Sequence, residues 1–104
     1  MIKFCQLWLT VGSKNEADKI AKVLLDKQLV ACARQISVAS DFRWRGKVDH
    51  TSEILMMMES RADLFDEVEA EVAKLHSYDT FVLEATPVTA ISKSAAAWLK
   101  RELK

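Results

Sequence analysis

The longest regular pattern in the chain runs from Val30 to Trp44, where residues alternate in the manner of a β-strand. One set of alternating positions holds Val30, Cys32, Arg34, Ile36 and Val38, and the other holds Ala31, Ala33, Gln35, Ser37 and Ala39. Successive side chains of a strand point to opposite faces of a sheet, so each set marks one face. The first set continues to Arg45-Gly46-Lys47, a glycine-containing reversal. The run therefore predicts a long strand followed by a turn.

This strand is long for the domain that 104 residues can form. Such a domain has a radius of gyration near 13 Å and a diameter of about 33 Å. An extended strand over residues 30–44 spans roughly 50 Å at about 3.3 Å per residue. With the returning strand expected over residues 51–59, the hairpin must bend, bulge or project. A projecting arm that carries Phe42 and Trp44 exposes apolar surface and strand edges, which another subunit usually covers. We therefore expect a homo-oligomer built through this hairpin.

The segment before the hairpin predicts a strand and a helix. Residues 2–11 are rich in Phe, Leu, Trp and Val, as in a buried strand. Ser13 and Glu16 have the spacing of a capping box, which predicts that a helix begins there. Apolar residues then recur three and four positions apart, so the helix is expected to pack one face on a sheet.

The segment after the hairpin repeats this order. Residues 60–63 have a second capping pattern and predict a helix that ends near His76. Residues 80–86 predict a short strand that Pro87 stops, because proline cannot donate to a ladder. A last helix is expected around Trp98. The resulting β-α-β-β-α-β order, with an added C-terminal helix, predicts a ferredoxin-like α+β sandwich with both crossover helices on one face of an antiparallel sheet.

Composition limits the organisation and the partners. Half the residues are hydrophobic and 29% are charged, which is typical of one globular domain over residues 1–104. Fifteen basic and fifteen acidic residues cancel, so neither a nucleic acid nor an anionic membrane is an expected partner. Cys5 and Cys32 form no C-x-x-C pair and no secretory signal is evident, so free thiols and a cytoplasmic location are expected.

Five spaced runs cover most of the chain. They are Leu29-Val30-Ala31-Cys32, Phe42-Arg43-Trp44-Arg45-Gly46-Lys47, Ser52-Glu53-Ile54-Leu55-Met56, Leu75-His76-Ser77-Tyr78-Asp79 and Ala85-Thr86-Pro87-Val88. Together they resemble the motifs of the CutA family of divalent-cation tolerance proteins. The resemblance implies a ferredoxin-like subunit that assembles as a homotrimer, similar in architecture to the PII signalling proteins. It also implies a role in tolerance of copper and other divalent metals, with no established catalytic reaction.

The chain departs from the family at the run that follows the second helix. The family pattern H-P-Y-x-x-P-E is here His76-Ser77-Tyr78-Asp79-Thr80-Phe81-Val82, so both prolines and the glutamate are absent. A metal such as copper(II) could bind His76 with oxygen ligands from Asp79, Glu84 or another subunit. The structural alternative is that the His76 imidazole interacts with the C-terminal end of the helix.

Other candidate residues belong to the trimer interface or to a ligand cleft within it. These are Cys32, Trp44, Lys47, Glu53, Tyr78 and Trp98. Cys32 is expected to be a buried core thiol rather than a reactive one. Lys47 and Glu53 are expected to pair within the hairpin. Met56 and Met58 share a strand face and are expected to pack in the core.

Three functions follow from this reading. The leading hypothesis is a CutA-like trimer that binds divalent metal and is not an enzyme. The alternative is a PII-like sensor that binds a small anion or nucleotide in clefts between subunits, although no glycine-rich phosphate loop is present. An acylphosphatase-like enzyme is the weakest hypothesis, because the chain has only two glycines and one asparagine to build a site of backbone and amide donors.

Overall fold

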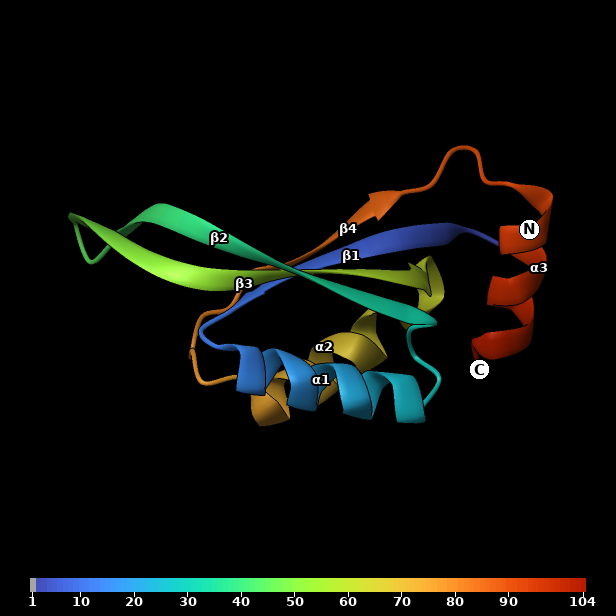
Figure 1. Cartoon of the computed structure of the whole chain (residues 1–104), viewed down its shortest axis with the longest axis horizontal. Coiled ribbons are helices and arrows are strands. Elements are labelled where there is room, and N and C mark those ends of the chain that lie inside the picture. The colour runs from blue at the N-terminus through green and yellow to red at the C-terminus, as the bar shows by residue number, and fades with distance from the viewer. Residues whose placement is uncertain (1) are drawn as a thin grey trace.

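The computed structural model describes residues 2–104 and contains one four-stranded sheet and three α-helices (Figure 1). In chain order the elements are β1 (Phe4–Val11), α1 (Lys14–Asp26), β2 (Cys32–Trp44), β3 (Lys47–Arg61), a 3-10 turn (Ala62–Leu64), α2 (Phe65–Leu75), β4 (Leu83–Pro87) and α3 (Lys93–Glu102). The strands lie in the order β2-β3-β1-β4 and all neighbours are antiparallel. The predicted ferredoxin-like α+β fold with an added C-terminal helix is confirmed.

Helices α1 and α2 cover one face of the sheet, and α3 lies beside one end of it (Figure 1). The core lies between the sheet and the first two helices. Its fully buried side chains include Leu7 and Leu9 of β1, Met56 and Met58 of β3, Ile20 and Leu24 of α1, and Val68 and Val72 of α2. The opposite face, which carries Trp8, Cys32, Ile36, Leu55 and Met57, is not covered by α1 or α2. We call it the open face. Within residues 2–104 no helix is long and apolar enough to cross a membrane.

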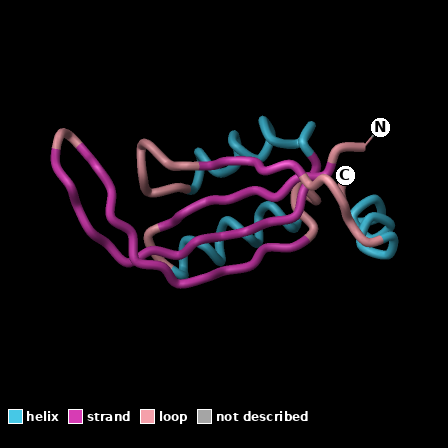
Figure 2. The backbone as a smooth tube through the Cα atoms, turned by 90° about the horizontal axis from the view of Figure 1, so that it is seen from above, coloured by secondary structure: helices cyan, strands magenta, loops and turns pink. Residues whose placement is uncertain are grey.

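The β2–β3 hairpin projects beyond the rest of the molecule (Figure 2). Its strands pair without a bulge from Cys32 opposite Glu59 to Trp44 opposite Lys47. Arg45 and Gly46 form the turn with φ values of 52° and 78°, the left-handed geometry of a two-residue type I′ hairpin. The returning strand is longer than the predicted residues 51–59. The molecule measures 45 × 25 × 22 Å, so the arm projects instead of bending back.

Two predicted boundaries are wrong for identifiable reasons. Ser60 does not cap α2: its side chain is fully buried, and Oγ donates to the Leu29 carbonyl at 2.7 Å. Helix α2 instead follows the 3-10 turn and has no side-chain cap. Strand β4 begins at Leu83 and includes Pro87, which lies opposite Cys5. Because β4 is an edge strand, it tolerates a residue that has no N–H.

Candidate functional site

The loop after α2 is fixed to β1 by His76. The backbone N–H of His76 donates to the Val72 carbonyl and ends the helix. Its ring is fully buried, stacks on Phe81 with centroids 5.1 Å apart, and places Nε2 2.8 Å from the Thr10 carbonyl oxygen. The ring therefore contacts β1, and the interpretation of His76 as a cap of the helix carbonyls is wrong.

Both ring nitrogens of His76 are engaged. Nε2 faces a carbonyl, so it must donate, and the Tyr78 N–H points to Nδ1 at 3.0 Å. Glu16 Oε2 also lies 3.2 Å from Nδ1. A neutral ring uses its Nδ1 lone pair for the Tyr78 N–H, whereas a protonated ring pairs with Glu16. In neither state does His76 present a free lone pair to a metal.

Glu16 is a residue whose role sequence reasoning missed. Ser13 Oγ accepts the Glu16 N–H at 3.2 Å, which is the predicted N-cap of α1. The Glu16 carboxylate does not complete the capping box. It accepts hydrogen bonds from the backbone N–H of Ser77 at 3.1 Å and from Ser77 Oγ at 2.8 Å. Ser77 supplies both donors, whereas a proline at this position would lack the N–H.

Tyr78 reaches from this loop to a buried carboxylate on β3. Its Oη donates to Glu53 Oε2 at 2.9 Å, and Glu53 is 9% exposed. Burial and the adjacent carboxylate raise the pKa of Tyr78 to about 12. A Cβ at Gly12 would lie 3.2 Å from Tyr78 Oη, so this close approach favours glycine. The structure thus brings together two predicted residues, Glu53 and Tyr78.

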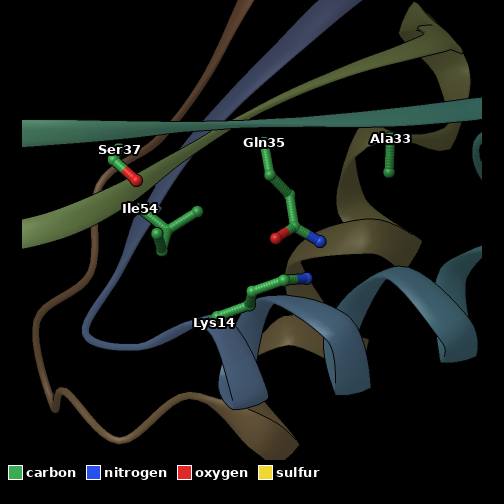
Figure 3. Close-up of a pocket in the computed structure, with 5 residues that line it drawn as sticks. All are labelled: Lys14, Ala33, Gln35, Ser37 and Ile54. Atoms are coloured by element: carbon green, nitrogen blue, oxygen red, sulfur yellow. The ribbon is translucent and has the colours of Figure 1, made fainter.

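Two adjoining hollows lie near this site, between the strand ends and α1. One of about 360 Å³ is lined by Gly12, Ser13, Ser37, Val38, Ala39, Ser52, Glu53 and Ile54. The other, of about 400 Å³, is lined by Lys14, Ala33, Gln35, Ser37 and Ile54 (Figure 3). Gln35 of β2 and Lys14 of α1 face each other across it (Figure 3). Both donate to Asp18, which holds the pKa of that carboxyl below its usual value.

The predicted metal ligands are not assembled in one chain. Asp79 and Glu84 are exposed, and Glu84 lies on β4 opposite Trp8. Residues 2–104 contain no group of three or more His, Cys, Asp or Glu side chains placed to hold a metal. A metal role for His76, Asp79 and Glu84 therefore stays a prediction that needs ligands from elsewhere.

His50 on the projecting arm is more accessible than His76. Its Nδ1 lies 2.6 Å from Asp41 Oδ1 across the hairpin, and both side chains are mostly exposed. A carboxylate that accepts from Nδ1–H leaves the Nε2 lone pair for a metal, the arrangement usual for metal-bound histidine. The sequence signal was the cross-strand register of the hairpin, which places Asp41 opposite His50.

The remaining candidates lie apart from one another. Lys47 and Glu53 are six positions apart on the same strand, roughly 20 Å, so their predicted pairing within the hairpin is wrong. Trp44 is exposed near the arm tip, where the Arg45 guanidinium lies 5.7 Å from its ring centroid. Trp98 packs against the core from α3.

Cys32 is half-buried on the open face, so its predicted place in the core is wrong. The alternation placed Cys32 on one face with Arg34, Ile36 and Val38 correctly, but α1 and α2 do not cover that face. Val30, which was predicted to share it, precedes β2 and is buried in the core. The nearby cation, Arg34, pairs with Glu59 at 3.2 Å. Cys5 is the buried thiol, and burial raises its pKa.

Comparison with known proteins agrees with this fold. Residues 5–102 match the model of the CutA1 divalent ion tolerance protein family. The chain is 37% identical over 93 residues to the divalent-cation tolerance protein CutA of Archaeoglobus fulgidus, covering 89% of this chain and 91% of the relative. The solved structure of the A. fulgidus protein, which is called periplasmic, superposes with a TM-score of 0.93 and full coverage of both chains. The crystal structure of rice CutA1 superposes with a TM-score of 0.95 at 25% identity and covers 99% of this chain and 95% of the rice chain. The chain belongs to the CutA1 divalent ion tolerance family.

Proposed function

We propose that the protein is a non-enzymatic homotrimer that binds divalent metal ions, copper(II) among them, and acts in metal tolerance in the cytoplasm. Membership of the divalent ion tolerance family supports the metal part of this proposal. The observation that carries the assembly is the open face together with the projecting arm.

The open face and the arm carry large apolar side chains along one side of β2. Ile36, Phe42 and Trp44 lie on the same side of the strand, with Val38 and Ser40 between the first two, and have exposed fractions of 52%, 38% and 47% in a single chain. Soluble proteins rarely leave such a row of large apolar side chains in water. Burial against neighbouring subunits accounts for it, and strand edges β2 and β4 supply unpaired backbone groups for the same contact.

The ligand that we propose for the metal is His50. Imidazole nitrogen suits copper(II), and Asp41 fixes the tautomer that leaves Nε2 free. The earlier candidate His76 would have to give up its contacts with Thr10 and Tyr78 before it could bind. The other ligands then come from solvent or from neighbouring subunits.

Native mass spectrometry during a copper(II) titration tests both parts. We expect a trimer that takes up copper, at least about tenfold weaker uptake for His50→Ala, and unchanged uptake for His76→Ala. Both variants should keep the trimer mass, which controls for misfolding. Loss of copper uptake only in His76→Ala would contradict His50 as the ligand and support the predicted site of His76, Asp79 and Glu84. A metal-free trimer would contradict metal binding, and a monomer would contradict the assembly.

The alternative function is a PII-like sensor of a small anion or nucleotide between subunits. The two adjoining hollows favour a ligand of some kind. Their charges do not suit an anion, because Glu53 lines one hollow and the Lys14 ammonium in the other is already bound by Asp18. We therefore keep metal binding as the main proposal.

A further inference from the structure

Glu53 is a buried carboxylate without a cation of its own chain. It is 9% exposed, its Oε2 accepts from Tyr78, and it forms no ion pair within residues 2–104. Its side chain lines the 360 Å³ hollow together with the hydroxyl-bearing residues Ser13, Ser37 and Ser52. A buried charge is costly unless it is paired and hydrogen-bonded. A carboxylate beside hydroxyl acceptors matches an ammonium group, which carries three donors and no acceptor.

The tip of the arm presents the complementary charge. Lys47 is exposed and makes no ion pair in the described part of the chain. It lies opposite Trp44, so the two side chains share one face of the hairpin, which continues the open face. Arg43 lies opposite Val48 on the other face, and Arg45 lies in the turn over the Trp44 ring. Of these three cations at the arm tip, Lys47 is therefore the one that lies in a strand on the same face as Ile36, Phe42 and Trp44.

The two charges cannot meet within one chain, because roughly 20 Å of β3 separates them. They can meet between copies if the arm of one lies across the base of the arm of the next. This contact joins two different surfaces, and such head-to-tail contacts close into rings when the rotation permits. In a closed ring every Glu53 and every Lys47 has a partner in a neighbouring copy.

We propose that Lys47 of one copy enters the Glu53 hollow of a second copy and pairs with its carboxylate, with Tyr78 holding the carboxylate in place. This inference rests on the proposed trimer and names the contact that closes it. The Trp44 ring, on the same face as Lys47, packs beside the hollow and excludes water from the pair.

Zero-length carbodiimide cross-linking tests the contact in the unmodified chain. Isotopically heavy and light copies are refolded together, cross-linked and digested. We expect peptides that join Lys47 of one isotope to Glu53 of the other. Assembly without this cross-link, or with Glu53 joined only to lysines outside the arm tip, would overturn the contact.

A double-mutant cycle measures the coupling. Lys47→Met and Glu53→Gln should each raise the trimer dissociation constant at least about tenfold. The dissociation constant of the double variant should not exceed the larger of the two single-variant values. Arg43→Met is the matched control: it removes a tip cation from the other face and should act independently of Glu53→Gln. Additive effects of Lys47 and Glu53 in an intact trimer would overturn the contact and leave the trimer standing. A monomeric wild-type chain would overturn both.

Discussion

The phenol of Tyr78 lies between Gly12 and the carboxylate of Glu53, and its ionisation reports on that position. Tyr78 is the only tyrosine in the chain, so near-ultraviolet absorbance follows its phenolate alone. We expect a titration midpoint of about 12 in the folded single chain, against 10 for the free phenol, and a smaller rise where Lys47 of a second copy neutralises Glu53. The folded state then keeps a proton that the unfolded chain releases. The free energy of unfolding should fall as pH rises through this window, and the contribution should be complete below pH 10.

Glu53→Gln provides the test of the cause. The variant removes the negative charge beside the phenol, so the midpoint should move down toward 10 while burial keeps it from reaching that value. Glu84→Gln alters an exposed carboxylate on β4 and should leave the midpoint in place. A wild-type midpoint equal to that of the urea-unfolded chain would show that the Tyr78–Glu53 hydrogen bond is absent.

At the scale of elements, the sequence predicted what depends on local spacing. The alternation along β2, the apolar stripe of α1, the Arg45-Gly46 turn and the Ser13 cap all involve residues close in the chain. The errors involve distant partners. Ser60 binds Leu29, 31 positions away, and Glu16 binds Ser77, 61 positions away. The face that helices cover is likewise a tertiary property, and for this reason periodicity alone misplaced Cys32.

Glu16 connects two such elements, the start of α1 and the loop after α2. Glu16→Ala removes acceptors from the Ser77 N–H and hydroxyl, and should lower the free energy of unfolding by about 1–3 kcal/mol. Urea denaturation measures this loss. Glu69→Ala, an exposed glutamate on α2, is the control and should stay within about 0.5 kcal/mol of the wild type. Equal effects of the two variants would mean that the carboxylate does not hold the loop.

At the scale of the whole molecule, the proposed trimer couples folding to assembly through the projecting arm and the open face. A single chain has a radius of gyration of 14.3 Å and is 45 Å long, with its apolar row in water. If copies cover that row, they bind the folded state and not the unfolded one. Mass action then stabilises the fold as concentration rises, and the melting temperature should increase over a hundredfold concentration range.

Two lysine substitutions at similarly exposed apolar residues distinguish loss of assembly from the effect of adding a charge to the surface. Ile36 lies on the open face and Leu25 on α1, on the far side of the sheet, with exposed fractions of 52% and 41%. In an isolated chain both changes are surface substitutions with small effects. In the proposed trimer Ile36→Lys places a charge in a subunit contact, so this variant should lose the concentration dependence, whereas Leu25→Lys should keep it. Calorimetry at several concentrations measures the difference, and a melting temperature of the wild type that is independent of concentration would contradict the coupling.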